Sequence, residues 1–437
     1  MHRYEYGNAD IIAPDVMRRC CNAILLVFFA MVASTAAENW PHWRGPRRDG
    51  TSTETGLPIK WSRTENILWR LPLPGPAAAT PVVWGNRIFL TSTEGNHLVL
   101  FCISTDGKIV WKRILGAGNK DVRGDEGNFA APSPSTDGRH IWAFVGSGEL
   151  LCYDFEGKEV WKTNLQTRYG KFNLFFVMAS TPLLEGNRLY LQLIHSDASL
   201  VLALDKTTGR EIWKHQRRSD ARAECEHSYA SPFLYRDGQR EFLLIHGADY
   251  ITAHRLNDGA EIWRCGGLNP KDSYNPSLRF VASPVAIPGL IIVPSAKNGP
   301  ILALRPDSKG DITNVRQQYL WLQPRGTPDV PSPLIHGGIV YLCRENGDLI
   351  ALDASTGARI YAQHTHLSRH RASPVYADGK IYVTSRDGVV TVVEAGRDFE
   401  ILSQNDLGEP ISASPVVSNR RIYLRSYNAL YAIQAAK

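Results

Sequence analysis

The chain has 437 residues, of which 43% are hydrophobic and 21% are charged, with 36 glycines and 26 prolines. This composition is typical of a turn-rich globular protein and excludes a disordered or collagen-like chain. The formal net charge is +6, but lysine and arginine are scattered, whereas nucleic-acid binding would need them clustered along one path. We therefore expect a mildly basic surface and no nucleic-acid partner.

The first residues have the pattern of an export signal. Arg18 and Arg19 precede an apolar run from Ala23 to Ala33, and small residues lead to Ala37. We predict a signal peptide over residues 1–37, with Met17 as a plausible true start and cleavage after Ala37, and hence an exported chain of the periplasm or extracellular space. The apolar run is short for a membrane span, so an uncleaved anchor is the alternative.

Residues 38–65 are rich in tryptophan, proline, glycine and arginine and show no lasting period. This pattern predicts an ordered N-terminal arm rather than a module of strands. Trp40, Trp43 and Trp61 are the expected anchors that pack the arm onto the body, and ligand stacking by these rings is the alternative.

From residue 66 to the end, the sequence repeats a unit of four short strands. In the unit from Ser180 to Lys214, the expected strands are Pro182–Leu184, Arg188–Leu193, Leu200–Asp205 and Glu211–Lys214. Gly186 and Asn187 supply the positive φ angles of a tight hairpin turn between the first two strands. Four antiparallel strands of this length form one twisted sheet that is too small to be stable alone.

The dipeptide that opens each unit gives the number of units. It recurs eight times at spacings of 41 to 53 residues, as Thr80-Pro81, Ser133-Pro134, Thr181-Pro182, Ser231-Pro232, Ser283-Pro284, Ser332-Pro333, Ser373-Pro374 and Ser414-Pro415. This period is that of a propeller blade. The sequence therefore predicts an all-β fold, an eight-bladed β-propeller of four-stranded antiparallel blades over residues 66–437.

The two ends of the repeat region complement each other. Residues 67–70 resemble the fourth strand of a unit without the three strands before it, and the last unit after Ser414 has three strands without a fourth. We predict that the N-terminal strand joins the last blade and closes the ring, which removes the open edges of a linear array.

Five cysteines follow the predicted signal, namely Cys102, Cys152, Cys225, Cys265 and Cys343. An odd number leaves at least one unpaired in an oxidising compartment. Cys102 and Cys152 hold equivalent positions in neighbouring units, about 10 Å apart, so they are expected to be small buried residues rather than a disulfide. A disulfide between Cys225 and Cys265, near connections on one face, is left open.

An aromatic residue recurs on the fourth strand, as Trp111, Trp161, Trp213, Trp263, Trp321 and Tyr361, and most simply packs blade against blade. The blade elements Ala203-Leu204-Asp205, Thr208-Gly209 and Ile212-Trp213-Lys214, with Ala351-Leu352-Asp353 and Thr356-Gly357, resemble the pyrroloquinoline-quinone (PQQ) repeat family of quinoprotein alcohol dehydrogenase-like propellers. Residues 40–46 and 309–313 further resemble exported bacterial propellers of this family. The resemblance implies eight blades docked through these tryptophans.

In its dehydrogenase members, the family resemblance implies calcium held by acidic and amide side chains, a catalytic aspartate, a tryptophan under the flat quinone, and a disulfide between adjacent cysteines. The adjacent Cys20 and Cys21 lie in the signal, and no tryptophan is expected at the channel. No acidic pair can be assigned as calcium ligands. We therefore predict no cofactor; PQQ with calcium enters only under an alternative function.

Propeller ligands bind at a mouth of the central channel, where the chain crosses inward before each first strand. Among the polar residues there, the candidate binding residues are His227, Tyr229, Arg279, Asp329, Arg369, His370 and Arg371. They suit an anionic or sugar-like ligand or a protein partner. No catalytic or metal-binding residue is predicted. His364 and His366 are expected to lie on an exposed connection, and a metal role for them is the alternative.

These patterns predict an exported, monomeric propeller that acts as a binding or scaffold protein through its channel mouth and loops. The alternative is a PQQ-dependent dehydrogenase that oxidises an alcohol or a sugar.

Overall fold

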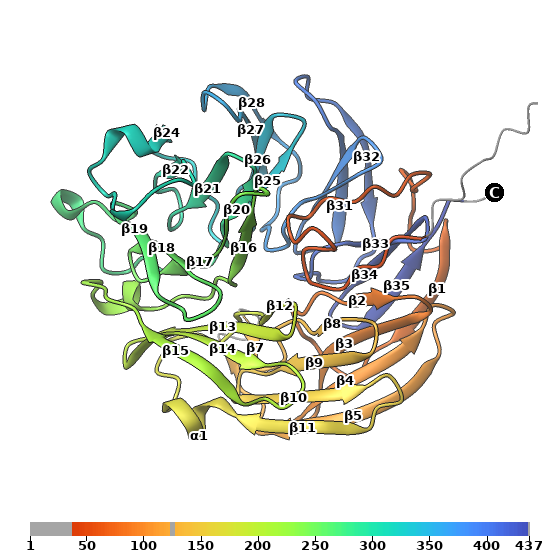
Figure 1. Cartoon of the computed structure of the whole chain (residues 1–437). Helices are drawn as coiled ribbons and strands as arrows, with labels where there is room; N and C mark the ends of the chain where they lie inside the picture. The colour runs from red at the N-terminus through yellow and green to blue at the C-terminus, as the bar shows by residue number, and fades with distance from the viewer. Residues whose placement is uncertain (1–36, 123–126, 436–437) are drawn as a thin grey trace, which may run out of the picture. The chain divides into compact units, whose positions relative to one another are not determined.

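The computed structural model describes residues 37–122 and 127–435. The predicted export signal, with Met17, Arg18 and Arg19, lies outside the described residues. In the described ranges, no helix combines the length and apolar character needed to cross a membrane. The strands form eight antiparallel blades around a central axis (Figure 1), which confirms the predicted all-β, eight-bladed propeller.

The first four blades follow one another along the chain, each running from an inner to an outer strand. Blade 1 contains β2 (Val82–Trp84), β3 (Arg87–Glu94), β4 (His97–Ser104) and β5 (Ile109–Ala117); blade 2 contains β8 (Ser135–Thr136), β9 (His140–Phe144), β10 (Glu149–Asp154) and β11 (Glu159–Asn164). Blade 3 contains β12 (Leu183–Glu185), β13 (Arg188–His195), β14 (Ala198–Asp205) and β15 (Glu211–Gln216); blade 4 contains β16 (Phe233–Arg236), β17 (Glu241–Gly247), β18 (Tyr250–His254) and β19 (Glu261–Cys265).

The next three blades repeat this order, and the last blade combines both ends of the repeat region. Blade 5 contains β20 (Val285–Ile287), β21 (Leu290–Pro294), β22 (Ile301–Leu304) and β24 (Tyr319–Gln323); blade 6 contains β25 (Leu334–His336), β26 (Ile339–Cys343), β27 (Asp348–Asp353) and β28 (Arg359–His364). Blade 7 contains β29 (Val375–Ala377), β30 (Lys380–Thr384), β31 (Val389–Glu394) and β32 (Ile401–Asp406); blade 8 contains β33 (Val416–Ser418), β34 (Arg421–Arg425), β35 (Ala429–Ile433) and β1 (Ile67–Pro72).

Blade 8 closes the ring. Its fourth strand is β1, which pairs antiparallel with β35 from Ile67 opposite Ile433 to Pro72 opposite Ala429. The two strands lie side by side in Figure 1, although they come from opposite ends of the repeat region. The predicted joining of the N-terminal strand to the last blade is therefore observed as this ladder.

The hydrophobic core lies between the blades. Successive side chains of a strand point to opposite faces, and each blade packs both of its faces against neighbours, so the middle strands read as nearly continuous apolar runs. Along β13, for example, every residue from Leu189 to His195 is buried. The outer strands alternate between buried and exposed residues because their outer edge meets solvent.

The repeated tryptophans dock the blades that carry them onto the next blade, as predicted. The indole N–H of Trp213 donates to the carbonyl of Leu256 in blade 4 at 2.9 Å, and that of Trp321 donates to Ala354 in blade 6 at 2.9 Å. Gly259 has a φ of +73°, and a Cβ there would lie 2.4 Å from the Trp213 ring. The glycine is thus required both by its backbone conformation and by the close approach of the indole.

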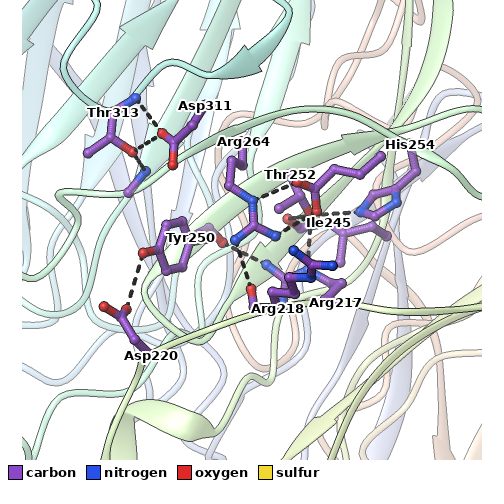
Figure 2. A network of polar contacts seen from close by, with 12 residues as sticks. Arg217, Arg218, Asp220, Ile245, Tyr250, Thr252, His254, Arg264, Asp311 and Thr313 are labelled. Atoms are coloured by element: carbon purple, nitrogen blue, oxygen red, sulfur yellow. Dashed lines mark hydrogen bonds and ion pairs between the residues drawn. The ribbon is translucent and has the colours of Figure 1, made fainter.

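Blade 4 carries a fifth strand that comes from an insert between β22 and β24. The insert, residues 306–318, contains β23 (Gly310–Asp311), which pairs parallel with β19. Its turn is held by the Asp311 carboxylate, which accepts from the N–H and hydroxyl of Thr313, while Gly266 N–H donates to the Thr313 hydroxyl at 2.8 Å (Figure 2). The insert therefore covers the outer edge of blade 4.

All five cysteines of the described chain are buried and free. Cys102 and Cys152 are unpaired, as expected, and burial raises the pKa of both thiols to about 12. The disulfide that the sequence left open is not formed, because Cys225 contacts the carbonyl of Asn275 and Cys265 contacts the hydroxyl of Tyr319.

Candidate functional site

A closed circle of hydrogen bonds surrounds the central channel. The backbone N–H of each residue that opens a blade donates to the hydroxyl of its counterpart in the next blade, at 2.9–3.1 Å. This hydroxyl ring consists of Thr80, Ser133, Thr181, Ser231, Ser283, Ser332, Ser373 and Ser414. The N–H of Ser414 donates to the hydroxyl of Thr80, which closes the ring. All eight residues line the channel. The repeated Ser-Pro and Thr-Pro dipeptides thus link neighbouring blades by hydrogen bonds around the central axis.

The N-terminal arm lies across one end of the channel. Trp43 lines the channel together with the hydroxyl ring. The next residue, Arg44, is 3% exposed, and its guanidinium donates to the carbonyls of Pro333 at 2.6 Å, Pro374 at 3.3 Å and Asp49 at 2.6 Å. Because Pro333 and Pro374 belong to blades 6 and 7, Arg44 ties the arm to the ring.

The expected anchors of the arm fall into two kinds. Trp40 and Trp61 are fully or almost fully buried and pack in the core cluster between blades 7, 8 and 1. Trp43 is half-buried at the channel, so the expectation of no tryptophan there was wrong. The strand repeat does not contain this tryptophan, because the arm supplies it to the channel.

The opposite end of the channel, which we call the mouth, opens into a cavity of about 180 Å³. Three aromatic side chains (Phe176, Tyr229 and Tyr427) and two arginines (Arg279 and Arg371) contribute to its wall. Most of the other lining residues are small or aliphatic, and Asp121 is the carboxylate of the described lining. The described lining therefore combines apolar surface with two arginines and one carboxylate.

Arg279 is held in place by charge and by an aromatic ring. Its Nη1 lies 3.3 Å from Glu224 Oε1, and its Nη2 lies 4.0 Å from Asp329 Oδ2. The guanidinium carbon lies 4.6 Å from the centroid of the Phe176 ring, within range of a cation–π interaction. These contacts fix the guanidinium at the cavity wall.

The aromatic side of the mouth is equally organised. The Tyr229 hydroxyl accepts from the backbone N–H of Phe176 at 3.2 Å, and the two rings meet edge to face at 5.7 Å. Across the mouth, the Tyr427 hydroxyl lies 3.1 Å from the Ser412 hydroxyl and accepts from Arg386 at 3.2 Å. Rings from blades 3, 4 and 8 are therefore positioned around one cavity.

The structure divides the seven predicted binding residues. Tyr229, Arg279 and Arg371 line the mouth. Asp329 lies behind the wall as a partner of Arg279, and Arg369 is exposed outside the lining.

The two predicted histidines are buried away from the lining. His227 is 2% exposed and its Nε2 lies 3.0 Å from the Ser196 hydroxyl; burial lowers its pKa. His370 is 1% exposed, its Nδ1 lies 2.9 Å from the carbonyl of Ser368, and burial lowers its pKa to about 4. Both imidazoles support loops rather than face a ligand.

Sequence reasoning missed Phe176, Tyr427 and Asp121. Phe176 belongs to the aromatic-rich run from Phe172 to Phe176, which is separated from the Thr181-Pro182 dipeptide by four residues and is itself a recognisable signal. Tyr427 lies in the turn between β34 and β35, and Asp121 lies in the small hairpin of β6 (Asp121–Val122) and β7 (Gly127–Asn128). The hairpin that holds Asp121 lies outside the repeated strands, and the repeated turn that holds Tyr427 has Arg386 at the same position in blade 7.

The described residues do not fit a calcium–quinone pair. Calcium takes six to eight oxygen ligands. The mouth offers the Asp121 carboxylate and the Asn128 amide, but the amide already bonds to the carbonyl of Pro76 and the N–H of Ala130. Across residues 37–122 and 127–435, no three histidine, cysteine or acidic residues are grouped closely enough to hold a metal.

Several solved structures have a fold similar to that of this chain. BamB from Moraxella catarrhalis is 16% identical, with a TM-score of 0.60 that covers 84% of this chain and 97% of that chain. A europium-containing methanol dehydrogenase is 12% identical, with a TM-score of 0.69 and 90% of both chains covered. Quinohemoprotein alcohol dehydrogenase from Comamonas testosteroni is 12% identical, with a TM-score of 0.66 and coverage of 92% and 81%. At these identities the similarity shows the fold alone.

Sequence comparison identifies the family. The outer membrane protein assembly factor BamB of Yersinia pestis is 25% identical over 263 residues, which cover 57% of this chain and 58% of that relative, less than two thirds of its length. The profile of one family matches residues 100–363, 247–398 and 345–437, which together make up more than half of the chain. The chain thus belongs to the PQQ-repeat propeller family that is described as outer membrane protein assembly factor BamB.

Proposed function

We propose that this protein is an exported, monomeric binding or scaffold propeller that holds a ligand or a partner group at the channel mouth. The observation that carries the proposal is the convergence of Arg279 and Arg371 with three aromatic rings on one cavity of about 180 Å³. Guanidinium groups bind carboxylates or phosphates, and aromatic walls bind apolar or planar bodies. The mouth therefore suits an anionic group on an apolar or aromatic body.

The build of the mouth supports binding by a preformed site. Arg279 is oriented by Glu224, Asp329 and Phe176 before any ligand arrives, and Tyr229 is fixed by its bond to the Phe176 backbone. Fixed side chains lose little entropy when a ligand binds. The described lining offers such binding groups but no histidine, no cysteine and no pair of carboxylates. The family name, an assembly factor, is consistent with a scaffold role.

The experiment compares a charged probe with its neutral counterpart. Titration calorimetry of the full chain with 2-naphthoate, an aromatic carboxylate, should give saturable one-to-one binding, and 2-naphthylmethanol should bind at least tenfold more weakly. Arg371→Gln should weaken naphthoate binding at least tenfold. Arg139→Gln, which changes an exposed arginine in the β8–β9 turn, should leave it unchanged.

Two results would overturn the proposal. If wild-type protein binds the two probes equally, or if Arg371→Gln binds naphthoate as wild type does, the arginines do not recognise an anion. In a separate arm, the protein is incubated with PQQ and calcium. A bound quinone spectrum together with dye reduction by alcohols or aldoses would replace the scaffold role with the dehydrogenase alternative.

A further inference from the structure

One repeated position fills the space between adjacent blades near the mouth. This position lies four residues after the aromatic position of the fourth strand, just beyond the strand end in most blades and inside β5 in blade 1. In six of the eight blades it is buried, with exposures of 8% or less, as Leu73, Leu115, Leu165, Arg217, Thr365 and Leu407. Leu115 packs with residues of blades 1 and 2, and Leu165 packs with residues of blades 2 and 3. The side chain at this position thus seals the gap to the next blade.

Arg217 shows how an arginine can seal the gap. Its guanidinium enters between blades 3 and 4 (Figure 2), where it donates to the Thr252 hydroxyl at 2.9 Å and to the carbonyls of Gly247 and Tyr250 at 3.2 Å each. It also donates to the Ser199 hydroxyl at 3.2 Å. The guanidinium therefore donates hydrogen bonds to polar groups of both blades that it joins.

Blades 4 and 5 break this rule, and each break leaves an open groove. The equivalent residues are Gly267 in blade 4 and Arg325 in blade 5, and both are exposed. Gly267 lines a groove of about 480 Å³ between blades 4 and 5, and Arg325 lines a groove of about 390 Å³ between blades 5 and 6. The grooves occur where the gap-filling side chain is missing or turned outward.

The groove between blades 5 and 6, which we call the 5–6 groove, is strongly basic. Arg325, Arg344 and Arg359 line it, and no acidic residue does. In contrast to Arg217, neither Arg325 nor Arg359 makes a side-chain hydrogen bond or an ion pair within the described residues. Arg344 lies 3.9 Å from Asp348 through Nη1, and its Nε is buried without a hydrogen-bond partner.

The floor of the 5–6 groove is apolar. Ile301 of blade 5 and Leu342, Ile350 and Leu352 of blade 6 form it, so the groove follows the middle and outer strands of blade 6. Three arginines around an apolar floor need a ligand with several negative charges and apolar groups between them. A single small anion would use the charges but leave the floor unfilled.

We propose that the 5–6 groove docks an acidic segment of a partner protein in which carboxylates alternate with apolar side chains. The carboxylates pair with Arg325, Arg344 and Arg359, and the apolar side chains cover the floor in the place that a leucine takes between other blades. This site is separate from the mouth, since the two cavities share no lining residue. Its failure or success is therefore independent of the function proposed for the mouth.

The test uses two rhodamine-labelled peptides, Glu-Leu-Glu-Leu-Glu and the uncharged Gln-Leu-Gln-Leu-Gln, and follows their fluorescence anisotropy with the full chain. The acidic peptide should bind saturably, at least tenfold more tightly than the uncharged one, and more weakly as salt rises. Arg325→Leu, which places in the gap the side chain found in four other blades, should reduce binding at least tenfold. Arg359→Gln, which leaves the gap open, should also reduce it several-fold.

Matched variants separate this site from the rest of the surface. Arg139→Leu, at an exposed turn of blade 2, and Arg210→Leu, at an exposed turn of blade 3, should bind the acidic peptide as wild type does. Circular dichroism establishes that each variant is folded. The proposal is overturned if wild-type protein binds both peptides equally, or if Arg325→Leu and Arg359→Gln both bind the acidic peptide as wild type does. It is also overturned if inorganic phosphate at low millimolar concentration displaces the peptide, because the groove would then be a site for small anions.

Discussion

Replacing Arg44 by methionine is the sharpest test of how the arm holds the ring. Methionine keeps an unbranched side chain but removes the guanidinium that bonds to Pro333, Pro374 and Asp49. Two of the lost bonds are short, at 2.6 Å, and each bond from a charged donor contributes about 1.5–3 kcal/mol. The loss from these two bonds is therefore about 3–6 kcal/mol.

A gain partly offsets this loss, because methionine is cheaper to bury. Burial lowers the pKa of Arg44 from 12.5 to about 10, which corresponds to roughly 3 kcal/mol of unfavourable desolvation at about 1.4 kcal/mol per pH unit. The carbonyls of Pro333 and Asp49 are left without this donor, at about 1–3 kcal/mol each. The cost of a lost bond already includes part of the cost of its unpaired carbonyl, so these contributions overlap and the net effect lies near the low end of their combined range. We expect Arg44→Met to lower the free energy of unfolding by about 2–4 kcal/mol.

The assay is thermal unfolding followed by far-ultraviolet circular dichroism, with urea unfolding as a second measurement. Over about 400 folded residues, 2–4 kcal/mol corresponds to a fall in Tm of roughly 2–5 °C. The control is Arg63→Met in the same arm, because the Arg63 side chain is 66% exposed and its ion pair with Asp406 contributes less than about 1 kcal/mol. A Tm of Arg44→Met equal to or above that of wild type would refute the reasoning.

Three other changes test packing and protonation. Gly50 has a φ of +86°, and a Cβ there would lie 2.8 Å from the Arg44 guanidinium carbon, so Gly50→Ala should lower the free energy of unfolding by about 1–3 kcal/mol. The loss should exceed that of Gly56→Ala, where φ is +71° but the nearest atom is 3.9 Å away. Equal urea midpoints of the two variants would contradict the clash. Arg325→Leu should raise the Tm by about 2–4 °C, since burying a leucine contributes about 1.5–3 kcal/mol. An unchanged or lower Tm would show that the gap does not close. Burial lowers the pKa of His246 and His254 to about 3 and that of His370 to about 4. In the unfolded chain the pKa of a histidine is about 6.5, so these side chains take up protons on unfolding between pH 6.5 and 4. Stability should therefore fall as pH falls through this window, by on the order of 2 kcal/mol per histidine at pH 5, and urea midpoints that stay constant from pH 7.5 to 5 would contradict this.

The blades could be predicted because each carries its own local signals. Alternating strands, glycine turns and the Ser-Pro or Thr-Pro openings recur within 41 to 53 residues, so the unit at Ser180 to Lys214 could be compared with its copies. The joining of β1 to β35 could also be predicted, because each end of the repeat region lacks what the other supplies. The repeat thus determines both the blade and the ring.

The mouth could be predicted only in part, because its residues come from irregular connections. His227 and Tyr229 are two positions apart, and in a strand they would share a face, yet only Tyr229 lines the mouth. Similarly, His370 is buried while the following Arg371 reaches the lining. Connections have no fixed period, so sequence spacing does not tell which side chain turns inward. Trp43 was missed for a further reason, since it approaches the channel from the arm.

The closure of blade 8 has a consequence for the order of folding. Ile67 and Ile433 are paired although 366 positions of chain separate them, and the hydroxyl ring is complete only when Ser414 donates to Thr80. Contacts between such distant residues form slowly. Until Ala429–Ile433 has been synthesised, β1 remains an unpaired edge strand and blade 1 has no neighbour on one side. A chain interrupted before Ala429 would therefore keep the hazard that the ring removes, an exposed edge able to pair with another molecule.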